Sequence, residues 1–347
     1  MEKGRNLYLD ILKAVSIILV IIGHSIQYGS GMEYLVWGKC LYNPVFSFIY
    51  SFHMPLFMLI SGYLFYFSCR NKSAKDLLIV KTKQILIPLF SWSVVSPLVH
   101  VIKIALGVSS HKISLIWIFQ TILSGFWGGP WFLWAIWWSS TLIILGRRLF
   151  KDSPIFYIII CLSMFFIPDE NNTAVYKFML PFFILAYLFN KYDLKNKLEN
   201  IYSHKAFGFT VLFVFLILLP HFNFDTYIYT TGYYILDKNI VYQLHNDCFR
   251  FVIGLVGSIA VMCIVHAFID VIPPIINRGM AYIGTCTLGI YLVSNYIFDE
   301  VLKYLPIPGL NYWYTLVEVI CVLGISLLIT LLLRHYKITN RLFLGGR

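Results

Sequence analysis

The sequence has few charged residues: only 12% of its 347 residues are Asp, Glu, Lys or Arg. Soluble domains carry about 25% charged residues. Hydrophobic residues make up 59% of the chain, and aromatic residues alone make up 18%. These values exclude an ordinary soluble globule and a disordered chain, and they indicate a membrane protein built from several apolar helices.

The sequence also lacks the short motifs that carry common cofactor chemistry. Its seven cysteines form no CxxC pair, and its nine histidines show no HxxH or HExxH spacing. It contains no GxGxxG and no Walker-type phosphate loop, which are the usual signatures of nucleotide sites. We therefore expect neither a metal site nor a nucleotide cradle.

Long apolar runs predict an all-α fold, a polytopic membrane helix bundle in one domain over residues 1–347 with no fused soluble domain. A membrane-spanning helix needs about 20 mostly apolar residues. The run at 113–126 is shorter, and we expect it to lie outside the membrane or to be re-entrant. The ten predicted spans cover residues 7–28, 43–67, 84–106, 130–149, 154–167, 174–190, 206–220, 248–269, 280–304 and 311–333.

The distribution of basic residues predicts which side each loop faces. With the N-terminus inside, roughly two thirds of the Lys and Arg residues fall in inner segments. This asymmetry predicts that both termini are cytoplasmic. The net charge of +11 is explained by the same loops, so we expect membrane lipid and no nucleic acid as a partner.

The largest predicted outer loop, residues 221–247, interleaves tyrosines with aspartates and histidines. Tyrosine rings stack on sugar faces and carboxylates accept hydrogen bonds from hydroxyls, which favours a polyol ligand. The same composition is typical of the aromatic belt at a membrane interface. The sequence supports the two interpretations equally.

The first predicted span contains three ionisable residues, Asp10, Lys13 and His24. Such groups are costly inside a membrane and are functional candidates by default. Lys13 and His24 are eleven positions apart, which places them on one helix face about 16 Å apart along the axis. Asp10 lies one turn before Lys13 and can pair with it. The alternative is that His24 only packs and that the Lys13 side chain extends to the interface.

The second predicted span contains His53, directly before Met54 and Pro55. A histidine at this depth is a second candidate for proton transfer, and it could face His24 from the neighbouring helix. The alternative is a buried histidine bonded to a backbone carbonyl. Ser61 and Gly62 further along the span predict a close approach between two helices.

Together these motifs resemble the membrane acyltransferase-3 family, the O-acyltransferases of bacterial surface polysaccharides, and within it the fucose-4-O-acetylase-like members. The first span has the family's basic residue followed by histidine, and later stretches match further blocks. The resemblance covers nearly the whole chain. It is carried by residues 9–13 with 22–25, 52–64, 81–88, 130–133 and 283–292.

The sequence departs from the family pattern at several positions. Lys13 stands where the family most often has Arg, and Lys81 and Lys83 replace a common Arg at the start of the third span. Lysine binds phosphate as a point charge without the bidentate geometry of arginine. Ser294 occupies the place of a frequent histidine, so no role of that histidine can be transferred to this chain.

The resemblance implies a bacterial inner-membrane enzyme that transfers an acetyl group from cytosolic acetyl-CoA to a sugar hydroxyl. The acceptor would be a surface or capsular polysaccharide or its lipid-linked precursor. His24 would act as general base or carry the acyl group itself, while His53 would orient His24 or polarise the thioester. The implied residues are His24 and His53 for catalysis, Lys13, Arg70, Lys81 and Lys83 for the donor, and Asp10, Trp131 and Tyr291 for the acceptor.

Two other functions fit a bundle with buried charges. One is a transporter or flippase for a lipid-linked or anionic saccharide, although the sequence shows no inverted repeat. The other is a non-catalytic membrane partner of a polysaccharide synthase. The sequence leaves open the acceptor sugar, the choice between an acetyl and a succinyl group, and the oligomeric state.

Overall fold

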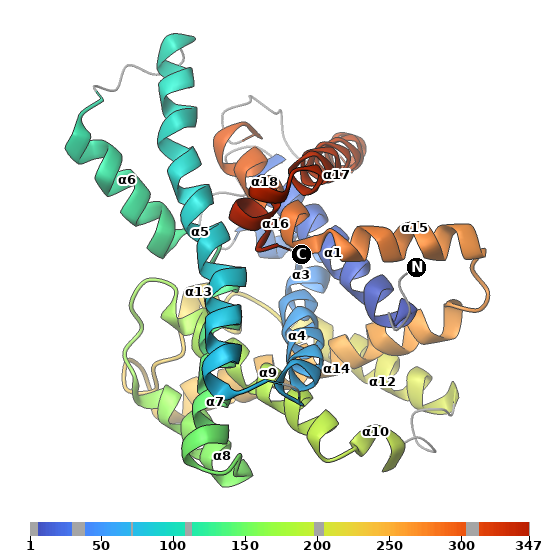
Figure 1. Cartoon of the computed structure of the whole chain (residues 1–347). Coiled ribbons are helices and arrows are strands. Elements are labelled where there is room, and N and C mark those ends of the chain that lie inside the picture. Colours follow the sequence, from blue (N-terminus) through green and yellow to red (C-terminus); the bar gives the residue numbers. More distant parts are fainter. Residues whose placement is uncertain are drawn as a thin grey trace.

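The structure, a computed structural model, describes residues 6–29, 39–70, 72–107, 113–197, 205–302 and 312–346. In these ranges the regular secondary structure is entirely helical (Figure 1), which confirms the predicted all-α fold. The helices are α1 (Leu7–Gly29), η1 (Lys39–Tyr42), α3 (Pro44–Tyr50), α4 (His53–Arg70), α5 (Ala74–Ala105), α6 (Leu115–Gly128), α7 (Trp131–Leu149), α8 (Pro154–Ser163), η2 (Met164–Phe166), α9 (Thr173–Lys191), α10 (Leu194–Lys197), α12 (Lys205–Leu218), η3 (Leu219–His221), α13 (Ile228–Thr231), α14 (Ile240–Phe268), α15 (Pro274–Thr285), α16 (Thr287–Glu300), α17 (Tyr312–His335) and α18 (Lys337–Leu344).

Six stretches of the described chain are long and apolar enough to cross a membrane, or seven if the bent pair α15 and α16 counts as one. They coincide with the predicted spans that begin near residues 7, 43, 84, 174, 248, 280 and 311. The predicted polytopic helix bundle is therefore confirmed, while the count of ten spans stays a prediction.

The other three predicted spans are helical but shorter or less apolar. Helix α7 has 19 residues, but tryptophans, hydroxyl residues at 139–141 and two arginines in its last turn lower its hydropathy. The stretches Pro154–Phe166 and Ala206–His221 reach only about 20 and 24 Å at the helical rise, against about 30 Å of hydrocarbon. Helix α6, with 14 residues, is likewise too short, in line with the expected re-entrant or external placement.

Small residues bring the long helices close together. A Cβ on Gly62 of α4 would lie 2.1 Å from the carbonyl oxygen of Phe183 on α9, so the two helix backbones touch there. This contact confirms the close approach that Ser61 and Gly62 predicted. Helix α1 packs against α15, α16, α17 and α4, which places the face that carries His24 inside the bundle.

The predicted span 280–304 is not one straight helix. Helices α15 and α16 meet at Cys286 in a 70° bend. Just before the bend, Gly284 lies so close to α1 that a Cβ there would overlap the carbonyl oxygen of Asp10. Arg334 of α17 donates to the carbonyl oxygen of Thr285 over 2.7 Å and contacts Cys286 Sγ at 3.2 Å. A carbonyl at the break therefore has a partner inside the bundle.

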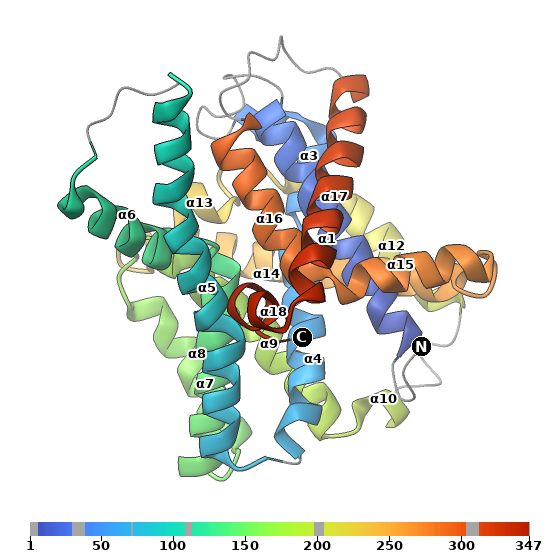
Figure 2. The same ribbon diagram turned by 45° about the horizontal axis from the view of Figure 1, so that its top comes forward.

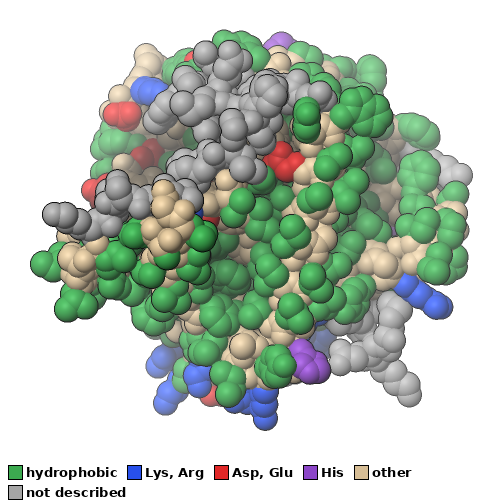
Figure 3. Space-filling model, turned by 90° about the horizontal axis from the view of Figure 1, so that it is seen from above, with side chains coloured by type: hydrophobic (Ala, Val, Ile, Leu, Met, Phe, Trp, Pro, Cys, Tyr) green, Lys and Arg blue, Asp and Glu red, His purple; other side chains and the backbone are tan. Residues whose placement is uncertain are grey.

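The two ends of the bundle differ in charge. In Figure 2 the α4–α5 and α7–α8 connections lie at the lower end, and the outer ends of α5, α16 and α17 lie at the upper end. Figure 3 shows Lys and Arg gathered along the lower edge, beneath a broad band of hydrophobic side chains. This arrangement agrees with the predicted sidedness, and the cytoplasmic position of both termini stays a prediction.

Candidate active site

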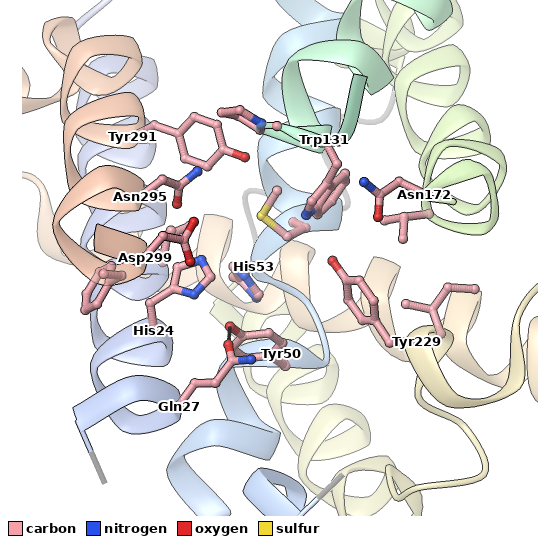
Figure 4. A pocket seen from close by; sticks show the side chains of 18 of the residues that line it. His24, Gln27, Tyr50, His53, Trp131, Asn172, Tyr229, Tyr291, Asn295 and Asp299 are labelled. Atoms are coloured by element: carbon pink, nitrogen blue, oxygen red, sulfur yellow. Dashed lines mark hydrogen bonds between the residues drawn. The ribbon is translucent and has the colours of Figure 1, made fainter. Parts of the chain in front are cut away.

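A cavity of about 690 Å³ opens in the upper half of the bundle. Helices α1, α4, α7, α9 and α16 and the segment around α13 contribute its walls. Four of the residues that the sequence singled out line it together (Figure 4): His24, His53, Trp131 and Tyr291. The structure thus brings both candidate catalytic histidines into one chamber, large enough for a small-molecule or sugar ligand.

His24 projects from α1 into a ring of aromatic side chains. Its imidazole centroid lies 5.5 Å from that of Phe298, 5.9 Å from Tyr28 and 6.5 Å from Tyr50. Its Nδ1 atom is buried and has no hydrogen-bond partner among the described residues. Packing of this kind holds the ring in place without occupying that nitrogen, so His24 can act in a proton transfer.

His53 is oriented by a break in its own helix. Helix α3 ends at Tyr50 and α4 begins at His53, and Pro55 in the first turn lacks the N–H that would continue the ladder. His53 Nδ1 lies 2.8 Å from the carbonyl oxygen of Ile49. A carbonyl only accepts, so Nδ1 carries the proton and Nε2 of the neutral ring is an acceptor.

This orientation changes the role expected for His53. The bond to Ile49 is the structural role weighed as the alternative, but His53 also lines the cavity while only 4% exposed. A neutral ring with Nε2 as acceptor is unsuited to polarising a thioester carbonyl, which needs a donor. His53 is better suited to accept a hydrogen bond or a proton from a hydroxyl.

One wall of the cavity is a polar stripe on α16. Tyr291, Asn295 and Asp299 are spaced four residues apart and all line the cavity, because positions i and i+4 share a helix face. Only Tyr291 was predicted. The spacing of Asn295 and Asp299 behind it, inside an apolar segment, is the sequence signal that could have identified the stripe.

The opposite wall presents further groups that bind hydroxyls. Trp131, Asn172 and Tyr229 face the cavity from α7, from the start of α9 and from α13 (Figure 4). Tyr50 donates to Gln27 Oε1 at 3.2 Å below them. Aromatic faces beside amide and hydroxyl groups are the combination expected for a polyol, and Tyr229 belongs to the outer loop in which the sequence indicated it.

The first-helix pair lies outside this cavity. Lys13 Nζ and Asp10 Oδ1 are 2.5 Å apart, as their spacing predicted, but neither residue lines the chamber. Asp10 is 4% exposed and its backbone touches Gly284. The structure therefore separates Asp10 from the other residues predicted to bind the acceptor.

The remaining basic candidates lie at the lower end of the bundle. Arg70 ends α4, and Lys81 and Lys83 lie in the first third of α5. Arg70 and Lys83 are exposed, and Lys81 Nζ lies 5.0 Å from the ring centroid of Phe65. None of the three lines the cavity, so any shared role requires a ligand that extends between the two ends.

Glu318 is an acidic residue that the sequence analysis missed. It lies in α17, a candidate span, and its Oε1 atom is buried without a hydrogen bond in the described part of the chain. A lone acid within an apolar run is the signal that could have identified it. In the described ranges no group of three or more His, Cys, Asp or Glu is arranged to hold a metal ion.

Comparison with known proteins places the chain among acyltransferases. Residues 6–335 match the model of the acyltransferase-3 family, described as an acyltransferase domain. Among curated proteins, the chain is similar to Nodulation protein NolL of Sinorhizobium fredii, with 24% identity over 85% of this chain and 78% of that protein.

A second relative is Nodulation protein NolL of Mesorhizobium japonicum, with 30% identity over 54% of this chain. The chain spans about half the length of that relative, 48%. No solved structure matches the chain. Since the family model covers nearly every described residue, from the first helix to the end of α17, the chain belongs to the acyltransferase-3 family.

Proposed function

We propose that this protein is a membrane O-acetyltransferase that moves an acetyl group from acetyl-CoA to a sugar hydroxyl of a surface polysaccharide or its lipid-linked precursor. One observation carries the proposal: His24 and His53 meet in a single cavity whose walls offer groups that bind hydroxyls. Membership of the acyltransferase-3 family supports the reaction class. The proposed location is the bacterial inner membrane.

In the proposed reaction the acceptor enters the cavity from the outer side. Its sugar ring packs against Trp131 and Tyr229, while Asn295 and Asp299 bind its other hydroxyls. His24 removes the proton of the attacking hydroxyl, a step worth about 10²–10⁴-fold when performed by a placed side chain. His53 Nε2 accepts a hydrogen bond from the same substrate, as its bond to Ile49 allows.

The donor is proposed to bind at the cytoplasmic end. Lys13, Arg70, Lys81 and Lys83 are the cations available for its phosphates. The spacing of about 16 Å between Lys13 and His24 is the length that an extended pantetheine arm would cover. The cavity reaches His24 but not Lys13. This route therefore requires the helices around Lys13 to separate enough for the pantetheine arm to pass between them.

In the direct route the acetyl group moves from sulfur to oxygen in a single transfer. The hydroxyl oxygen attacks the thioester carbon, the new C–O bond forms and the C–S bond breaks. The proton taken by His24 then passes to the departing thiolate and releases free CoA thiol. In the alternative route the His24 imidazole attacks first and holds the acetyl group until the sugar arrives, which predicts ping-pong kinetics.

The test is thiol release from acetyl-CoA by full-length protein in detergent, with O-deacetylated surface polysaccharide as acceptor. We expect release that requires the acceptor and falls at least about 100-fold in His24→Ala. The matched control is His100→Ala, because His100 also has a buried Nδ1 without a partner in the described chain but lies on α5 outside the cavity. Equal rates in wild type and His24→Ala would refute the mechanism.

A saccharide transporter or flippase is the second candidate, and one observation favours it. The 70° break between α15 and α16 resembles the discontinuous helices that transporters use at substrate sites. A transporter would move the saccharide in proteoliposomes without consuming acetyl-CoA. Thiol release that depends on the acceptor therefore separates the two functions.

A further inference from the structure

The segment Tyr227–Thr231 forms one wall of the cavity and ends at Gly232, where several hydrogen bonds hold the backbone. Tyr227, Ile228, Tyr229 and Thr230 line the cavity from this segment, and Gly232 follows after Thr231. Gly232 has φ +68°, a conformation that other residues rarely adopt. The placement of Tyr229 in the cavity wall therefore depends on what holds the backbone at Gly232.

The first attachment is an ion pair beside α9. Asp169 Oδ2 accepts hydrogen bonds from the backbone N–H groups of Tyr233 and Tyr234, at 2.6 and 3.0 Å. Its Oδ1 lies 2.5 Å from Nζ of Lys177, which is only 4% exposed. A Cβ on Gly232 would lie 2.4 Å from Asp169 Oδ2, so the absence of a side chain is what lets the carboxylate reach the two amides.

The second attachment comes from α14. Arg250 Nη1 donates to the carbonyl oxygen of Gly232 at 2.7 Å, and Nη2 donates to Thr231 Oγ1 at 2.6 Å. Arg250 pairs with Asp247 at 3.3 Å. Gln243 Nε2 links Gly232 to Asp247, because it donates to the Gly232 carbonyl and to Asp247 Oδ2, each at 3.1 Å.

The arginine in this network is unusually placed. Arg250 is 2% exposed and lies within the candidate span Ile240–Phe268. A charge at such a site is costly unless it is paired and fully hydrogen-bonded. The two terminal nitrogens of the Arg250 guanidinium donate to Thr231 and Gly232 at the same time. A lysine ammonium concentrates its donors at one point and cannot reproduce this arrangement.

We propose that Arg250 is a positioning residue of the acceptor site: it fixes the segment Tyr227–Thr231 so that Tyr229 forms the wall against which the sugar binds. The inference rests on the function proposed above and adds the residues that determine acceptor binding. Tyr229 contacts the saccharide, and Thr231 and Gly232 act through it. Arg250 also reaches the cavity wall, but its two guanidinium hydrogen bonds are spent on holding this segment. The donor end of the bundle is not involved.

The test measures acceptor binding separately from transfer. O-deacetylated surface polysaccharide is titrated into full-length protein in detergent, and binding is followed by tryptophan fluorescence, since Trp131 lines the cavity. We expect Arg250→Lys to weaken binding at least about tenfold, because a single ammonium cannot donate to both Gly232 and Thr231 as the guanidinium does. Thr231→Val removes only the hydrogen bond from Arg250 Nη2. It should weaken polysaccharide binding less than Arg250→Lys and disturb the fold less.

Controls separate positioning from general loss of structure. Lys191→Gln removes another partly buried ion pair, to Asp152, at the lower end of the bundle and should leave polysaccharide binding unchanged. In transfer assays Arg250→Lys should raise the KM for polysaccharide and leave the KM for acetyl-CoA within about twofold. Its loss should also be non-additive with that of Tyr229→Phe, since one acts through the other.

Several results would overturn the inference. Unchanged polysaccharide binding in both Arg250→Lys and Thr231→Val would do so, and so would equal increases in the two KM values with a lower unfolding midpoint. Absence of polysaccharide binding by the wild type would also reject it. Polysaccharide binding that depends on Arg250 without any thiol release would instead support the site and reject the acetyl transfer.

Discussion

Helix α15 touches α1 at Gly284, where the two backbones leave no room for a side chain. A Cβ added to Gly284 would lie 1.8 Å from the carbonyl oxygen of Asp10, and real Cβ contacts essentially never fall below 3.0 Å. The two helices would therefore have to separate by at least about 1.2 Å, the difference between these values. The obstacle is backbone on both sides, so no side chain can rotate away.

Gly284→Ala is expected to be destabilising although alanine favours a helix. Overpacking of a well-packed contact costs about 1–3 kcal/mol. Gly279 lies in the same helix with nothing within 4 Å of its Cβ position, so Gly279→Ala should gain up to about 1 kcal/mol from helix propensity. The two variants should thus differ by about 1–4 kcal/mol.

The assay is thermal unfolding in detergent, followed by the fluorescence of the nine tryptophans. Gly284→Ala should unfold at a clearly lower temperature than wild type, and Gly279→Ala at the same or a higher temperature. Equal unfolding midpoints for the two variants would refute the close backbone contact between α15 and α1 at Gly284.

Three further predictions concern the site. His53→Asn can keep a donor for the Ile49 carbonyl but lacks Nε2 as acceptor of a hydrogen bond from the substrate, so thiol release should fall by up to about tenfold with little change in the unfolding midpoint; an unchanged rate would exclude a chemical role for Nε2. Gly232→Ala places a Cβ 2.4 Å from Asp169 Oδ2 at φ +68°, and we expect a loss of about 1–3 kcal/mol in thermal unfolding, whereas wild-type stability would contradict the close contact between Gly232 and Asp169. Lys13→Met should raise the KM for acetyl-CoA at least about tenfold and Lys13→Arg should restore it; a normal KM in both would exclude a donor role.

The sequence by itself determined the class of protein and part of its chemistry. Hydropathy and helical periodicity are local properties, so composition fixed the all-α membrane bundle and the eleven-residue spacing placed Lys13 and His24 on one face of α1. The Asp10–Lys13 pair and the close contact at Gly62 followed from spacing along single helices. These features need no knowledge of which helices are neighbours.

The tertiary structure decided which residues share a site. The walls of the cavity come from segments as distant as α1, α9 and α16, and only their packing brings Asn295, Asp299 and Tyr229 opposite His53. The surroundings of the break at Cys286 are equally non-local, because they include the backbone of α1 and Arg334 from α17. Hydropathy records how apolar a segment is, but it contains no information on the close contacts between helices or on the partners that allow Arg250 to be buried.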